Sequence, residues 1–302
     1  MTSSAPAPEP AADPAAGQIA ERGGLPVLEW SIFADHPIDV AVTTRDGGVS
    51  EGPYESLNLG LHVGDEPDRV VENRARAAAA IGLGLDELVF CNQAHGRAVA
   101  RVDAHDRGRG TRTADTAIPG ADALITRTPD VGLVVMMADC VPIVLYDPVT
   151  ASLACIHAGW RGTVARVVAA TVERLVADGS RPGDLLAGIG PAIPYERYQV
   201  GPEVARAARE QLGEDADGVV VPDGEGRWRF DLWEANRRSL RRAGVPATSI
   251  ELAAIPTGAD GPFFSDRAVR PCGRFAALAR LRPPGPTPGP TAGPTPPAKE
   301  RR

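Results

Sequence analysis

The chain has 302 residues, of which 43% are hydrophobic, so it can bury the core of one large domain or two small ones. Its net charge is -7 and its isoelectric point is about 5.3. This acidic balance argues against a general nucleic-acid binder, which needs a basic face to neutralise phosphates. The sequence has no secretory signal and no apolar run approaching the roughly 20 residues of a membrane span, so we expect a cytoplasmic protein.

Composition divides the chain into three parts. Residues 1–23 are rich in Ala, Pro and Glu, and residues 283–302 repeat Pro, Gly and Thr. Neither segment can bury a core, so both are predicted to be disordered tails around a single catalytic domain at residues 24–282. Strands alternate with helices in this domain, but hairpins occur too. The pattern predicts mixed α/β layers, with mixed β-sheets covered by helices, rather than a regular doubly wound sheet.

The domain begins with predicted strands at residues 27–32 and 40–44, followed by a turn at residues 45–48 (RDGG). The two glycines of this turn permit positive backbone dihedrals and let a ligand approach closely. Arg45 could therefore bind a substrate or phosphate, or it could be an ordinary surface arginine of a turn.

A helix is predicted next, at residues 66–81. Asp65 is its expected N-cap, and Pro67 falls in the first turn, where its missing N–H donor is harmless. A strand at residues 88–92 follows. Residues 103–119 are polar and glycine-rich, and they are expected to form a mobile loop.

Three strands are predicted in the middle of the chain. The apolar run at residues 132–137 has the length and composition of a buried strand, and Cys140 follows close to its end. Residues 142–146 and 152–156 form the next two strands, and the second delivers His157. Neighbouring strands would place Cys140 and His157 at one edge of a sheet.

The clearest helical pattern follows His157. It begins near Thr163, and its apolar positions are Val164, Val167, Val168, Thr171, Val172, Leu175 and Val176. The N-terminus of such a helix would suit an anion beside His157. Arg161 could clamp phosphate there or form only a surface ion pair. Two later helices are predicted at residues 202–212 and 232–242.

Two imidazoles and one thiolate, from His95, Cys140 and His157, make a candidate catalytic zinc set. Such sites use three protein ligands and leave the fourth position open. The spacing is not that of a zinc finger, so only folding can bring the three together. Copper also accepts these donors. A buried structural cysteine and hydrogen-bonded histidines are one alternative, and Cys140 as a nucleophile with His157 or His95 as its base is another.

The remaining histidines and cysteines carry no assigned chemistry. His36 and His62 lie in loop-like settings, and His105 lies in the polar loop. Cys91 and Cys155 fall in predicted strands and are interpreted as core residues.

Six segments of the chain, taken in order, resemble the motifs of the YfiH family. They are residues 43–50 (TTRDGGVS), 56–60 (SLNLG), 92–96 (NQAHG), 138–142 (ADCVP), 157–162 (HAGWRG) and 188–193 (GIGPAI). The resemblance runs from about Trp30 to Leu281. Members of this family have been called multicopper polyphenol oxidases, laccase-domain proteins and purine nucleoside phosphorylases with adenosine deaminase activity. By this resemblance the metal-binding His, Cys and His fall on His95, Cys140 and His157.

The resemblance implies a metal-dependent purine nucleoside phosphorylase with adenosine deaminase activity. Its expected substrates are adenosine and inosine, with guanosine and methylthioadenosine as further candidates. Zn²⁺ is the expected cofactor and Cu²⁺ the alternative. The expected partners are a nucleoside and phosphate, with no nucleic acid or membrane, and the chain is expected to be a monomer. For deamination, Asp139 is the carboxylate nearest to Cys140 in sequence and a candidate acid or base, although adjacent strand residues point to opposite faces.

Three other functions stay open from the sequence. They are a copper-dependent polyphenol oxidase, a Cys-His hydrolase acting in peptidoglycan precursor editing, and a binding module without activity. The five histidines of the chain are too few for a conventional multicopper laccase.

The C-terminal motif departs from the family pattern. The family pattern is FFSYRR followed by a Gly-Arg pair, whereas residues 263–268 read FFSDRA before Gly273 and Arg274. Asp266 replaces the tyrosine and Ala268 replaces the second arginine. Residues 256–257 (PT) stand where a cysteine often precedes the motif. These changes bear on substrate preference more than on fold or metal binding.

Overall fold

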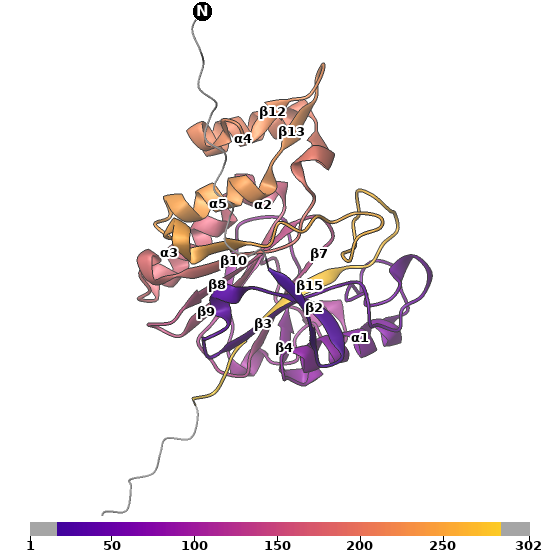
Figure 1. Ribbon diagram of the computed structural model, residues 1–302. Coiled ribbons are helices and arrows are strands. Elements are labelled where there is room, and N and C mark those ends of the chain that lie inside the picture. The colour runs from indigo at the N-terminus through magenta and orange to yellow at the C-terminus, as the bar shows by residue number, and fades with distance from the viewer. Residues whose placement is uncertain (1–16, 285–302) are drawn as a thin grey trace, which may run out of the picture.

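The first sheet of the computed structural model, which describes residues 17–284, has six strands. In spatial order they are β1 (Gln18–Arg22), β2 (Leu25–Glu29), β3 (Ile38–Thr43), β15 (Phe275–Leu281), β7 (Gly132–Met137) and β4 (Leu88–Phe90). Neighbours are antiparallel except β4 and β7, which are parallel. β15 therefore pairs with β3 from the opposite end of the sequence (Figure 1).

The predicted boundary of the N-terminal tail at residue 23 is wrong. Residues 18–22 form β1, which pairs with β2 through a turn at Gly23 and Gly24, where φ is +58° and +81°. Three of its five residues are polar and none is buried, so the strand carries no alternating apolar signal. Residues 1–16 and 285–302, which make up most of the two predicted tails, lie outside the described residues.

The second sheet also has six strands. Their order is β14 (Ile250–Leu252), β10 (Leu186–Ile189), β8 (Val141–Asp147), β9 (Ser152–Ala158), β6 (Ala123–Thr126) and β5 (Val99–Arg101). β8 and β9 form the long antiparallel hairpin that the sequence predicts. A small third sheet joins β11 (Gln199–Val200), β13 (Trp228–Phe230) and β12 (Val220–Pro222).

Five α-helices accompany these sheets within residues 17–284. They are α1 (Pro67–Ala80), α2 (Trp160–Val164), α3 (Val167–Ala177), α4 (Pro202–Leu212) and α5 (Leu232–Arg242). None of them is both long and apolar enough to cross a membrane. The N-cap of α1 is Glu66 and not Asp65, because the Asp65 carboxylate instead accepts hydrogen bonds from Ser50 and Asn58.

The helix expected to begin near Thr163 is two helices. α2 begins at Trp160 and lasts five residues, and Arg166, with φ of +62°, separates it from α3. A residue in the left-handed conformation cannot continue an α-helix. The apolar spacing of the sequence continues across this break, so it gives no sign of it. The single long helix is therefore wrong, and the helix start that follows His157 belongs to the short α2, so the anion site expected there stays a prediction.

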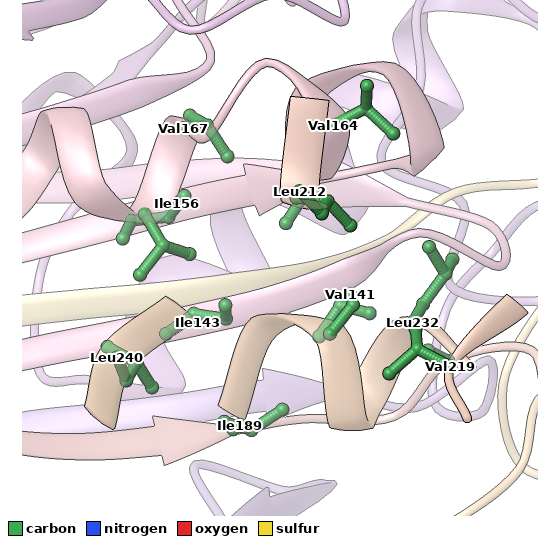
Figure 2. Packing of buried hydrophobic residues seen from close by; sticks show 14 of the residues in the cluster. Val141, Ile143, Ile156, Val164, Val167, Ile189, Leu212, Val219, Leu232 and Leu240 are labelled. Atoms are coloured by element: carbon green, nitrogen blue, oxygen red, sulfur yellow. The ribbon is translucent and has the colours of Figure 1, made fainter. Parts of the chain in front are cut away.

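Alternating side chains divide the buried residues into layers. On β8, Ile143 and Leu145 pack against the helices, whereas Val144 and Tyr146 pack between the two large sheets. Figure 2 shows side chains of β8, β9 and β10 meeting those of α2, α3 and α5 in the helix-facing cluster. α1 covers the other face of the first sheet. The predicted class of mixed sheets covered by helices is confirmed.

This layering positions the candidate site. β7 ends in the first sheet and β8 begins in the second, so residues 138–140 cross from one sheet to the other. Pro142 of β8 lies opposite His157 of β9 in the hairpin register. The crossing therefore places Cys140 close to the end of β9 that carries His157.

Candidate metal centre and cavity

The structure brings His95, Cys140 and His157 together. One ligand atom from each residue lies within 4.8 Å of the other two. The imidazole rings of the two histidines are 4.8 Å apart and nearly perpendicular, at 86°. Among residues 17–284 this is the single such group of three His, Cys, Asp or Glu side chains.

Asp122 connects two of the three ligand segments. Its Oδ1 atom lies 2.9 Å from His157 Nδ1 and accepts a hydrogen bond of 2.9 Å from the backbone N–H of His95. Its Oδ2 atom accepts a 2.6 Å bond from the N–H of Gly96. The residue is fully buried, at 0% exposure. A carboxylate on Nδ1 leaves Nε2 of His157 as the ligand atom and fixes the orientation of the ring.

Gln93 ties the His95 segment to the first sheet. Its side-chain amide donates to the carbonyl of Met136 and accepts from the N–H of Met136, both at 2.8 Å. His95 itself has a φ of +57°, in the left-handed region. This conformation is strained for any residue other than glycine. The two bonds between Gln93 and Met136 anchor the segment that contains it.

Gly159 leaves room for the cluster. A Cβ atom at this position would lie 2.7 Å from Cys140 Sγ and 3.3 Å from His95 Cδ2. Only a glycine lets the backbone after β9 pass this close to two of the three candidate ligands.

The charges of the cluster suit a metal ion. Burial raises the pKa of the Cys140 thiol, but the charge of His157 and hydrogen bonds with both imidazoles outweigh it and lower the pKa to about 6. Burial lowers the pKa of His157, but Cys140 and Asp122 outweigh it and raise the pKa to about 9. Without a metal the pair is thus a thiolate and an imidazolium, and a cation binding there would displace the proton of His157. Two imidazole nitrogens and a thiolate are donors that zinc and copper both accept.

A cavity of about 460 Å³ opens beside the three ligands, within the range of small-molecule sites. Aromatic and apolar side chains in its lining include Phe90, Trp160, Ile193 and Tyr198. The arginines that line it are Arg74, Arg161, Arg267, Arg270 and Arg274. The cavity therefore combines apolar surface with positive charge, next to candidate metal ligands.

Comparison with known proteins places the chain in a family. The family model described as multi-copper polyphenol oxidoreductase laccase matches residues 39–282. The chain belongs to the YfiH family. A solved structure of YfiH from Bacillus licheniformis superposes with a TM-score of 0.82 and 35% identity, covering 85% of this chain and 96% of that one.

Curated relatives of this YfiH-family chain are named as enzymes. A purine nucleoside phosphorylase of Deinococcus radiodurans is 43% identical, over 74% of this chain and 80% of its own length. The adenosine deaminase RL5, from an unknown prokaryotic organism, is 38% identical, over 70% of this chain and 81% of its own length.

The two predicted arginines have different positions in this YfiH-family fold. Arg161 lines the cavity, and its guanidinium lies 4.4 Å from the centre of the Trp160 ring. The structure does not bring Arg45 to the cavity. Its guanidinium donates to the carbonyls of Glu55 and Ala259. The turn that carries Arg45 packs against its own chain, because a Cβ on Gly48 would lie 2.0 Å from the carbonyl oxygen of Ser56.

Asp139 holds the C-terminal loop. Its Oδ1 atom accepts hydrogen bonds of 2.6 Å from the hydroxyls of Thr257 and Ser265, and its Oδ2 atom accepts a 2.7 Å bond from the N–H of Arg267. Both oxygens accept hydrogen bonds from this loop, so the carboxylate, which also lines the cavity, positions Arg267. Thr257, at the place of the expected cysteine, supplies one of these bonds.

Sequence reasoning missed Asp122, Gln93, His62 and the arginines after residue 266. The signal for Asp122 is a carboxylate directly before the buried run at 123–126, but its partner His157 is 35 residues away. His62 lines the cavity from a segment without any helical or strand pattern.

Proposed function

We propose that this chain is a metal-dependent purine nucleoside phosphorylase that also deaminates adenosine. The observation that carries the proposal is the juxtaposition of His95, Cys140 and His157 with a cavity lined by arginines and aromatic rings. The names of the related proteins supply the purine nucleoside as the substrate class.

His95, Cys140 and His157 would hold the metal, and Asp122 would keep His157 in the tautomer that leaves Nε2 free. A zinc ion held there supplies a Lewis acid, which polarises a substrate oxygen or lowers the pKa of water to about 7.

Phosphorolysis needs an anion site close to the ribose. One phosphate oxygen forms a bond to the ribose C1′ while the bond from C1′ to the purine breaks, and the leaving purine takes up a proton. The guanidinium of Arg161 forms no hydrogen bond or ion pair with residues 17–284, so its donors are available to phosphate. Arg267, whose guanidinium lies 5.2 Å from the centre of the Tyr198 ring, is a second cavity arginine, and its Nη1 already donates to the carbonyl of Gln199.

Deamination uses the same purine-binding surface. Water supplies the oxygen that replaces the 6-amino group, and ammonia leaves. The apolar and aromatic lining from Phe90, Trp160, Ile193 and Tyr198 provides a face on which a purine can pack.

The test is a chromatographic assay of metal-analysed protein with inosine or adenosine, with and without phosphate. We expect phosphate-dependent release of hypoxanthine from inosine, and conversion of adenosine to inosine without phosphate. His95→Ala should abolish both reactions, whereas His105→Ala, which changes an exposed histidine outside the cavity, should keep them. A zinc-loaded protein that turns over neither nucleoside would refute the proposal. Phenol oxidation with copper and hydrolysis of peptidoglycan precursors would then be assayed.

A further inference from the structure

We propose that Asp266 makes the cavity selective for uncharged nucleosides by occupying two arginines that would otherwise bind a phosphorylated substrate. The inference rests on the proposed function, because it concerns how the same cavity distinguishes a nucleoside from its 5′-phosphate. Asp266 would thus be a specificity-determining residue.

One carboxylate spans two guanidinium groups in the cavity wall. Asp266 Oδ2 lies 2.6 Å from Arg270 Nη2, and Asp266 Oδ1 lies 3.3 Å from Arg274 Nη2. All three residues line the cavity. Arg270 also donates from Nε to the backbone carbonyl of Asp266, at 2.9 Å, which fixes the arginine beside the carboxylate.

The arginines of the cavity fall into two groups. Arg161 and Arg267 lie near Tyr198 and Cys140, at the metal end. Arg274 packs against the segment at residues 59–60, and it lies near enough to His62, with Arg74, to lower the pKa of that imidazole further after burial. The arginines at this second end already have acceptors in the protein, and so does Arg267, which donates to the carbonyl of Gln199. The guanidinium of Arg161 has none among residues 17–284.

Arg74 contributes little free charge at the second end. It is 2% exposed, and its guanidinium donates to the backbone carbonyls of Leu59, Gly110 and Thr111. Nη1 of Arg274 likewise donates to the carbonyls of Cys272 and Gly273. Arg270 and Nη2 of Arg274 are therefore the cavity donors whose binding to a ligand depends on Asp266.

A fixed carboxylate discriminates by charge. A 5′-phosphate carries about -1.5 to -2 charges at neutral pH, so it must displace Asp266 from the arginines or lie beside a like charge. Both outcomes weaken binding. A nucleoside avoids this cost, because its ribose hydroxyls can donate to lone pairs of the carboxylate that the arginines leave free. Inorganic phosphate is then directed to Arg161 at the metal end.

The carboxylate and its two arginines come from one short segment of the chain, at residues 266–274. Arg270 follows Asp266 by four residues in the sequence, so their ion pair is a local contact.

The test compares adenosine with adenosine 5′-monophosphate in the zinc-loaded full chain. Asp266→Asn keeps the side-chain shape and removes its charge. We expect the ratio of kcat/KM for adenosine to kcat/KM for the monophosphate to fall at least tenfold, mainly through a lower KM for the monophosphate. An unchanged ratio would overturn the inference. Asp260→Asn makes the same change in net charge at an exposed position outside the cavity, and it should leave the ratio unchanged.

Binding provides a readout that does not depend on turnover. Calorimetry should show adenosine 5′-monophosphate binding about tenfold more tightly to Asp266→Asn than to the wild type, with a smaller change for adenosine. Adding Arg270→Gln to Asp266→Asn should remove this gain, and thermal unfolding would verify that each variant is folded. Equal affinity of the wild type and Asp266→Asn for the monophosphate would overturn the inference. Absence of nucleoside turnover alone would refute only the proposed function.

Discussion

At the scale of single residues, the candidate metal centre depends on Asp122, a carboxylate that is not one of its three candidate ligands. Asp122 accepts hydrogen bonds from one ligand ring and from the backbone of the segment that carries another ligand. Burial raises its pKa, but the bonds from His157, Gly96 and His95 outweigh that effect and lower it. Asp122 therefore stays ionised and fixes the positions of His95 and His157 relative to each other.

Replacing this carboxylate should weaken metal binding. We predict that Asp122→Asn reduces zinc affinity by about 10- to 100-fold, the usual effect of losing a residue that orients a metal ligand. Competition with a chromophoric chelator measures the affinity. Asp115→Asn, at an exposed carboxylate that does not line the cavity, is the control, and equal affinities in the two variants would contradict the assigned role.

Cys140 should react as a thiolate at unusually low pH. Its pKa is lowered to about 6 from an ordinary value of 9.0, so the reactive form is present above pH 6 and is lost as the pH falls through that value. In metal-free protein, the rate of alkylation of Cys140 should have its midpoint near pH 6, and zinc should suppress the reaction. A midpoint near 9 would show that the imidazoles do not stabilise the thiolate.

The residue types of the centre were predictable, but its organisation was not. His95, Cys140 and His157 stand out in the sequence because imidazole and thiolate groups follow predicted strands. The contact between Asp122 and His157 joins residues 35 positions apart, and no local sequence pattern encodes it. The sequence left Arg45 as either a ligand-binding or a surface arginine, because a turn with two glycines is compatible with close packing of the chain on itself as well as with a ligand.

At the scale of elements, the apolar strands were the most predictable parts. Residues 132–137 form β7 with the predicted bounds, because a continuous apolar run of strand length is buried on both faces. α4 and α5 also have their predicted bounds. β1 was missed because it is a polar edge strand, and the break at Arg166 was missed because its left-handed dihedral leaves the apolar spacing intact.

The β8–β9 hairpin should carry much of the stability of the second sheet. Ile143 is fully buried between this sheet and the helices, so Ile143→Ala should lower the free energy of unfolding by about 2–5 kcal/mol. Val176→Ala, at a position that is 43% exposed on α3, should change it by less than about 0.5 kcal/mol. Chemical denaturation measures both, and similar losses would contradict the packing of these elements.

At the scale of the whole molecule, two stacked sheets bring distant segments to one centre. The candidate ligands come from the loop after β4, the crossing from β7 to β8, and the end of β9. The order of motifs predicted the family, whereas the pairing of β15 with β3 and β7 depends on contacts between the two ends of the domain.

A metal at this centre should stabilise the folded chain, because it links segments from both large sheets. At a free zinc concentration of 100 times the dissociation constant, the gain is about 2.7 kcal/mol if the unfolded chain does not bind the ion. We predict that zinc raises the thermal unfolding midpoint of the wild type but not of Cys140→Ala. Equal shifts in both proteins would place the binding site elsewhere.

The most direct test of the account is release of hypoxanthine from inosine by protein of measured zinc content. We predict that release requires phosphate and falls to background in His95→Ala together with the zinc content, while His105→Ala retains both. Phosphate-dependent release by His95→Ala protein without zinc would contradict the proposed metal centre. No release by the zinc-loaded wild type would contradict the proposed phosphorylase activity.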